Sequence, residues 1–124
     1  VTNVLIAGSS VVVSDGLAAS IDALPGVTVT RLGGKDRFAT ASAVTRNAFP
    51  ASPTVYLATG LNFPDALAGA ALAGSQGAGL LLTPPTCIFR QGAQDLIDLG
   101  TTKGVILGST DVMSTGVSTF VNCD

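Results

Sequence analysis

Short apolar runs alternate with helical patterns along this chain, and that alternation constrains its fold more than any other feature. The expected strands are Val4–Ala7, Val27–Arg31, Val55–Ala58, Leu80–Leu82 and Val105–Leu107. The expected helices are Ser14–Leu24, Lys35–Phe49, Pro64–Ser75, Gln91–Leu99 and Ser114–Val121. Strands that alternate with helices through short loops predict a mostly parallel sheet covered on both faces. We therefore predict an α/β fold, a single three-layer domain with about five strands in a central sheet.

The composition fits one domain with an aliphatic core. A chain of 124 residues has the size of one ordinary domain. Hydrophobic residues make up 47% of it, aromatic residues only 5%, and 15 residues are glycine. Helices rich in small side chains can pack closely over strands, which suits a layered α/β architecture.

Missing residue types exclude several classes of enzyme. The sequence has no His, no Glu and no Trp, and all eight acidic residues are Asp. A Ser-His-Asp triad is therefore impossible. A closed zinc site needs about four nitrogen or sulfur ligands, whereas only Cys87 and Cys123 are available. We expect no catalytic activity, no cofactor and no metal. A small hydrolase or phosphate-handling enzyme built on Asp and hydroxyl groups is allowed by the fold class but supported by no motif.

Two cysteines separated by 36 positions leave two interpretations open. In an exported protein, Cys87 and Cys123 would form a disulfide, because no other thiol competes for either of them. In a cytoplasmic protein they would be two buried free thiols. The count of cysteines alone favours neither.

The two ends of the chain resemble each other at an offset of 100 residues. Residues 5–17 align with 105–117 without a gap. Six of the aligned pairs are identical: Ile6 and Ile106, Gly8 and Gly108, Ser9 and Ser109, Val12 and Val112, Ser14 and Ser114, Gly16 and Gly116. We interpret residues 1–124 as one module of a longer repeating pattern, with an end unit at 1–24, a central block at 27–83 and a second copy of the end unit at 105–121.

Neither a membrane span nor a nucleic-acid surface is expected. Residues 66–89 carry no charge, but Ser75–Gly79 interrupts that stretch and Pro84-Pro85 ends it. An overall pI near 4.7 with few aromatic residues argues against binding to duplex nucleic acid.

Basic residues are concentrated in one segment. Four of the six, Arg31, Lys35, Arg37 and Arg46, lie within 16 positions that contain a single acid, Asp36. An anionic polymer would be attracted to this segment if the four side chains share a face. Arg37 could bind an anionic group of a ligand through its planar guanidinium, or it could pair with a nearby Asp or hold a neighbouring loop.

Loops at the carboxyl ends of the strands are where ligands bind in open α/β sheets. Asn62 and Asp65 lie in such a loop, within Thr59–Leu67, and could hydrogen-bond a ligand. They could equally fix the turn and satisfy the first N–H groups of the following helix. Gly33-Gly34 has neither the dinucleotide nor the P-loop spacing, so we expect a tight turn that uses positive φ angles.

Four segments in order resemble the cell wall binding repeat 2 family. They are Arg31-Leu-Gly-Gly-Lys-Asp-Arg-Phe-Ala-Thr-Ala41, Leu57-Ala-Thr-Gly-Leu-Asn-Phe-Pro-Asp-Ala-Leu-Ala-Gly69, Leu80-Leu-Leu-Thr-Pro84 and Val105-Ile-Leu-Gly-Ser109. The resemblance implies a compact α/β module of Toprim-like or flavodoxin-like type. It also implies a secreted protein on the Gram-positive cell surface, and hence favours the disulfide between Cys87 and Cys123.

The resemblance further implies a noncatalytic function. Family members attach exported proteins to the wall by binding anionic secondary polymers, such as polysaccharides or teichoic acids. Carried over to this chain, the ligand-binding candidates are Arg31, Lys35, Arg37, Arg46, Asn62 and Asp65. Such modules commonly form pseudo-trimers, so like modules in the same chain or in a homo-oligomer such as a trimer are expected partners. This chain has one central block where the family usually has three. The alternative is therefore an assembly module whose binding or enzymatic activity resides in other domains.

Overall fold

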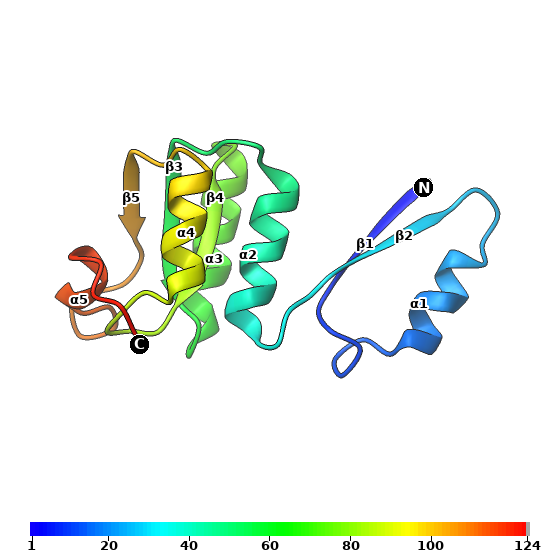
Figure 1. Cartoon of the computed structure of the whole chain (residues 1–124), viewed down its shortest axis with the longest axis horizontal. Coiled ribbons are helices and arrows are strands. Elements are labelled where there is room, and N and C mark those ends of the chain that lie inside the picture. The colour runs from blue at the N-terminus through cyan, green and yellow to red at the C-terminus, as the bar shows by residue number, and fades with distance from the viewer. Residues whose placement is uncertain (124) are drawn as a thin grey trace.

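The computed structural model describes residues 1–123, which form a body and a projecting arm (Figure 1). The strands are β1 (Asn3–Ala7), β2 (Thr28–Leu32), β3 (Thr54–Thr59), β4 (Gly79–Thr83) and β5 (Lys103–Ile106). The helices are α1 (Asp15–Asp22), α2 (Arg37–Ala48), α3 (Phe63–Ser75), α4 (Arg90–Asp98) and α5 (Thr115–Ser118). We call residues 3–32 the N-terminal arm and residues 37–123 the body. The α/β class and the order of the elements confirm the prediction.

All strand pairs are parallel, but they form two sheets where we expected one central sheet. In the body the order is β4-β3-β5, and in the arm β1 pairs with β2. The register joins Val55 to Gly79 and to Gly104 across β3, and Asn3 to Thr28 in the arm. A strand has only two edges, and β3 already uses both of them. The β1–β2 pair therefore cannot join the sheet of the body through β3.

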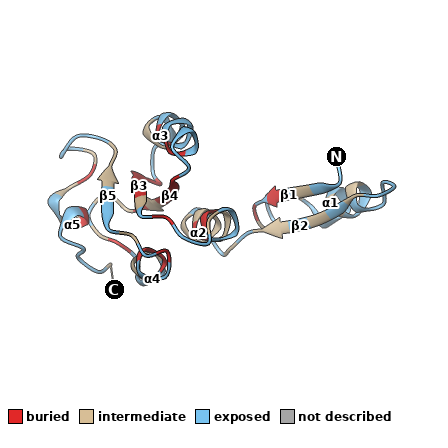
Figure 2. Ribbon diagram, turned by 90° about the horizontal axis from the view of Figure 1, so that it is seen from above, coloured by how far each residue is buried: buried red, intermediate tan, exposed pale blue. Residues whose placement is uncertain are grey.

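Alternating side chains of β3 divide the core between its two faces. Val55 and Leu57 face a cluster that includes Leu96 of α4. Tyr56 faces the opposite side, where it packs with Ala73 of α3. Helix α3 thus covers one face of the sheet and α4 the other, whereas α2 lies beside β4, the edge strand (Figure 2). Figure 2 shows that buried residues are concentrated in the body, whereas the arm is largely exposed.

Helix α3 ends where the sequence predicted, at Ser75. Gly77 then takes a left-handed conformation, with φ of 61°, before β4 begins at Gly79. Among residues 1–123, no helix combines the length and the apolar character needed to cross a membrane.

The C-terminal unit, which we define as residues 103–123, is tied to the rest of the body by the predicted disulfide between Cys87 and Cys123. A parallel bridge joins Ile88 to Asn122 beside it. The prediction that the last helix continues to Val121 is wrong, because α5 ends at Ser118. Phe120 has a left-handed φ of 57°, which turns the chain back toward the cysteine.

We expected Gly33 and Gly34 to form a tight turn with positive φ angles, but neither residue has a positive φ. Both positions require glycine for a steric reason instead. A side chain on Gly33 would place its Cβ 2.6 Å from the carbonyl carbon of Gly8. A side chain on Gly34 would collide with the Cβ of Ala39, at 2.3 Å. Both glycines thus permit close approach of backbone segments where the arm meets α2.

Candidate functional site

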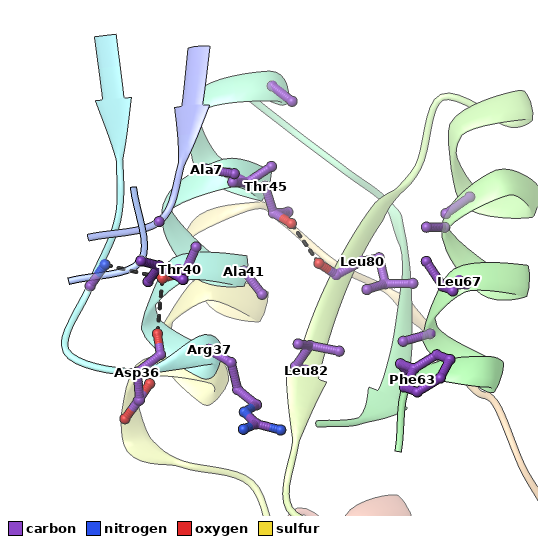
Figure 3. Close-up of a pocket in the computed structure, with 18 of the residues that line it drawn as sticks. Ala7, Asp36, Arg37, Thr40, Ala41, Thr45, Phe63, Leu67, Leu80 and Leu82 are labelled. Carbon is purple, nitrogen blue, oxygen red and sulfur yellow. Dashed lines mark hydrogen bonds between the residues drawn. The ribbon is translucent and has the colours of Figure 1, made fainter. Parts of the chain in front are cut away.

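A groove of about 840 Å³ runs between α2 and α3 across β4, and the end of β1 and the loop after it, in the arm, also line it (Figure 3). Its α3 side is apolar, with Phe63 and Leu67 largely exposed to solvent. Leu80 and Leu82 of β4 form its floor, and Thr45 of α2 closes one side by donating a hydrogen bond from Oγ1 to the Leu80 carbonyl oxygen at 2.6 Å. The volume is within the range of ordinary ligand sites.

Two predicted site residues, Lys35 and Arg37, line one end of this groove (Figure 3 labels Arg37). Asp36 between them caps α2 by accepting a hydrogen bond from the Ala39 amide at 2.8 Å, as expected for an acid at this position. The cap begins α2 at Arg37 and thereby places the two cations at the mouth of the groove. This end of the groove can receive an anionic group.

Arg37 also holds a neighbouring loop, which was one of the structural alternatives to ligand binding. Its Nη1 donates a hydrogen bond to the Gly60 carbonyl oxygen at 2.6 Å. A guanidinium carries five N–H donors, and this bond uses one of them. Arg37 can therefore hold the loop after β3 and still present donors to an anion.

Asn62 and Asp65 lie at the start of α3, outside the lining of the groove. Asn62 occupies the N-cap position, yet its side chain makes no capping hydrogen bond. Asp65 lies in the first turn, where a negative charge favours the positive end of the helix dipole. A Cβ on Gly108 would lie 3.2 Å from the Asp65 carboxylate, so Asp65 faces the loop after β5.

Arg31 lies in the arm and has local partners there. Its Nη1 donates to the Gly8 carbonyl oxygen at 3.0 Å, and its Nη2 pairs with the Asp15 carboxylate at 3.2 Å. These contacts tie the end of β2 to the loop after β1 and to α1.

Arg46 lies near the other end of α2 and joins it to α4. Its Nη1 pairs with Asp95 at 3.0 Å and with Asp98 at 2.8 Å. Asp95 is fully buried, and Gln91 also donates to its Oδ1. The four basic residues of the 31–46 segment are thus divided between the arm, the groove and the α2–α4 contact.

The carboxyl group of Asp98 has a lowered pKa because it accepts hydrogen bonds from the Gln94 amide and from the Arg46 guanidinium. A carboxyl group with a lowered pKa in the folded state stabilises the fold above its unfolded pKa of about 3.9. That contribution is lost as the pH falls through the lower pKa of the folded state.

We expect Asp98→Asn to reduce the acid sensitivity of the fold. The midpoint of urea unfolding should fall less steeply for this variant than for the parent chain between about pH 5 and about pH 2. Asp111→Asn is the matched control, because Asp111 is an exposed carboxylate in the loop before α5. Equal acid sensitivity of Asp98→Asn and the parent would contradict the expectation.

Sequence reasoning missed the apolar part of the site. Phe63 and Leu67 are four residues apart, which places them on one face of α3. We expected helices rich in small side chains only to pack closely over the strands. Their exposure follows from the absence of a strand beyond β4, a property of the sheet order rather than of the local sequence.

Comparisons with known proteins agree on one family. Residues 31–118 match the model of the family described as Cell wall binding domain 2 (CWB2). The N-acetylmuramoyl-L-alanine amidase LytC of Bacillus subtilis (strain 168) is 30% identical over 89 residues, which are 72% of this chain and 18% of the amidase. The structures of Cwp8 and Cwp6 from Clostridium difficile match with TM-scores of 0.80 and 0.85, at 24% and 23% identity. Each match covers 94% of this chain and 19% of the solved chain, and these two likenesses concern the fold.

Proposed function

Because the chain belongs to the cell wall binding domain 2 family, over residues 31–118, we propose that it is a noncatalytic module that anchors an exported protein to the Gram-positive wall. In this proposal the ligand is an anionic secondary wall polymer, a polysaccharide or a teichoic acid. The chain spans less than a fifth of LytC, which is an N-acetylmuramoyl-L-alanine amidase. Any such activity in the protein that carries this module would then belong to other parts of that protein.

The observation that carries the proposal is the groove between α2 and α3, with cations at one end and an apolar wall along its length. Lys35 and Arg37 would bind an anionic group of the polymer through charge-assisted hydrogen bonds. Phe63 and Leu67 would pack against the less polar face of a neighbouring unit of the polymer. Arg31, Arg46, Asn62 and Asp65 would then act mainly by holding the arm, α2 and α3 in place.

Sedimentation with purified walls tests the proposal. The module should sediment with native walls at low salt and remain in solution when the secondary polymers have been removed chemically. Moderate salt should weaken the binding, because part of the attraction is electrostatic. Equal recovery with intact and stripped walls would contradict polymer binding.

Arg37→Ala is expected to weaken wall binding about tenfold, which corresponds to the loss of one charge-assisted hydrogen bond of about 1.5 kcal/mol. Lys103→Ala is the matched control, because it removes the same charge at the opposite end of the sheet, where β5 begins. Binding isotherms to walls, together with circular dichroism of both variants, measure the effect. A loss of cooperative melting in Arg37→Ala would assign Arg37 to the scaffold through its bond to Gly60.

The alternative function, assembly with like modules, is favoured by a separate observation. The arm exposes Val11, Val12 and Leu17, although side chains of this kind are usually buried. A stable oligomer without wall affinity in the same sedimentation experiment would favour assembly over anchoring.

A further inference from the structure

We propose that the N-terminal arm fits the body of a second like module, at the surface that the C-terminal unit of that module otherwise covers, and docks there when that unit is displaced. We call this surface the seat: the β5-facing edge of β3, the Thr86–Ile88 segment, and the core side chains Leu57, Leu81 and Leu96.

The first observation is that the two ends of the chain fold alike. Gly8 and Gly108 both adopt left-handed φ angles, 130° and 113°. In each copy the carbonyl oxygen of the following serine accepts two hydrogen bonds: Ser9 from Val12 and Val13, Ser109 from Val112 and Met113. A serine then caps a helix in each copy, Ser14 in the arm and Ser114 in the C-terminal unit.

The second observation is that equivalent side chains differ in burial. Val117 is fully buried in the core of the body, whereas its counterpart Leu17 is 52% exposed. Val112 packs against the same core, whereas Val12 is 77% exposed. The arm therefore has the apolar face of the C-terminal unit but lacks the core that covers it.

The third observation concerns one pair of glycines. Gly116 lies so close to the Thr86 backbone that a Cβ would overlap the Thr86 carbonyl oxygen, at 2.0 Å. Gly16 occupies the same position in α1, yet a Cβ there would meet nothing closer than the Ser14 hydroxyl, at 4.0 Å. Glycine is unfavourable in a helix relative to alanine. Nothing in residues 1–123 requires a glycine at 16, whereas a second body with its own Thr86 segment would.

The fourth observation is the direction of the backbone groups of β1. The Gly8 amide donates to the Leu32 carbonyl oxygen of β2, and in the C-terminal unit the Leu107 amide donates to Leu57 of β3. Successive amides of a strand point to opposite edges. The amide of Ala7, the counterpart of Leu107, therefore points away from β2. It lies on the edge of β1 that corresponds to the edge by which β5 binds β3.

These observations specify the register of the interface. Shifting the β3–β5 pairs by 100 residues places Asn3 opposite Thr54, Val4 opposite Val55, and Ile6 opposite Leu57 of the second body. Strand β1 would then have β2 on one edge and a β3 strand of the partner on the other. The arm would link two bodies by main-chain hydrogen bonds. Val12 and Leu17 of the arm would also make the apolar contacts that Val112 and Val117 make in the C-terminal unit.

The test displaces the C-terminal unit from the seat in the full chain. In its own body the seat is filled and the Cys87–Cys123 disulfide holds the C-terminal unit there. A seat-open variant combines Gly116→Val, which prevents the unit from approaching Thr86, with Cys87→Ala and Cys123→Ala. We expect this variant to associate in sedimentation equilibrium, with arms entering vacated seats. Adding Gly16→Val should return it to a monomer, because the arm then carries the same steric block.

Controls separate this interface from unfolding and from other occupants. Gly16→Val in the parent chain should leave melting and sedimentation unchanged, because the space around Gly16 is open. In the associated form the amides of Asn3, Leu5 and Ala7 should gain protection from hydrogen exchange. A folded seat-open variant that stays monomeric would overturn the proposal, as would association that persists with Gly16→Val. Protection of those amides in a monomer would instead mean that the arm closes onto its own body.

If the seat-open variant does not fold, the single variant Cys123→Ala provides a second test. Cys123→Ala leaves Gly116 in place and removes only the covalent clamp. It should associate at higher concentration than the seat-open variant, and Gly16→Val should again abolish the association. Monomeric behaviour of folded Cys123→Ala at every concentration where the protein is soluble would overturn the proposal.

Discussion

Replacing Cys87 and Cys123 together by alanine is expected to lower the free energy of unfolding by about 4 kcal/mol. The disulfide closes a loop of 36 residues, and the open chain has more conformations in the unfolded state. Domains of this kind have a total stability of about 5–15 kcal/mol, so the loss is a large fraction of the whole. Urea unfolding of the oxidised parent and of the double variant measures the difference.

Reduction of the parent chain provides the control for this prediction. The reduced parent should unfold at nearly the same urea concentration as the double alanine variant, because both lack the same cross-link. A midpoint of the variant equal to that of the oxidised parent would show that the C-terminal unit is held by its noncovalent contacts alone. Those contacts include the bridge from Ile88 to Asn122 and the burial of Val117.

Leu57→Ala is expected to lower the free energy of unfolding by about 3 kcal/mol. Leu57 lies in the middle of β3, the central strand of the body, and is almost completely buried in the larger core cluster. Removing its side chain loses burial and leaves a cavity that rigid neighbours on β4 and α4 can fill only in part. Denaturant unfolding at constant m-value measures the loss.

Leu61→Ala is the matched control for Leu57→Ala. Leu61 follows the same strand by two residues, but its side chain is largely exposed. The two variants delete the same atoms, so the difference between them isolates the effect of burial. Similar unfolding midpoints for both would mean that the core near β3 is loosely packed, contrary to the burial of Val55, Leu57 and Leu81.

Local signals were sufficient for most of the elements. The cap at Asp36 begins α2, Pro64 lies in the first turn of α3, and the Gly77 turn precedes β4, all as the residue types predict. The last helix was predicted too long because Phe120 takes a left-handed φ, which is rare for an aromatic residue. The contact of residues 121–123 with the Cys87–Ile88 segment accompanies that conformation, and such a contact is not visible in a local pattern.

The candidate site was predictable only in part. Lys35 and Arg37 follow a strand and lie where the next helix begins, so their position at the carboxyl end of the sheet could be inferred. Sequence proximity also suggested that Arg31 and Arg46 would join them. Arg31 instead pairs with Asp15, and Arg46 reaches Asp95 and Asp98, partners about 50 residues away in the sequence.

The sequence by itself determined the α/β class and the order of strands and helices, because hydrophobic periodicity, caps and turn residues act over a few positions. The family was recognisable from the resemblance of four segments between Arg31 and Ser109. Tertiary structure decided which strands share a sheet, which basic residues reach the groove, and why Gly33 and Gly34 are glycines. Each of these depends on contacts between distant segments. The two end units show the difference most clearly: residues 5–17 and 105–117 have similar sequences and the same local structure, yet only the second copy lies against a core, because β3 has one edge to offer it.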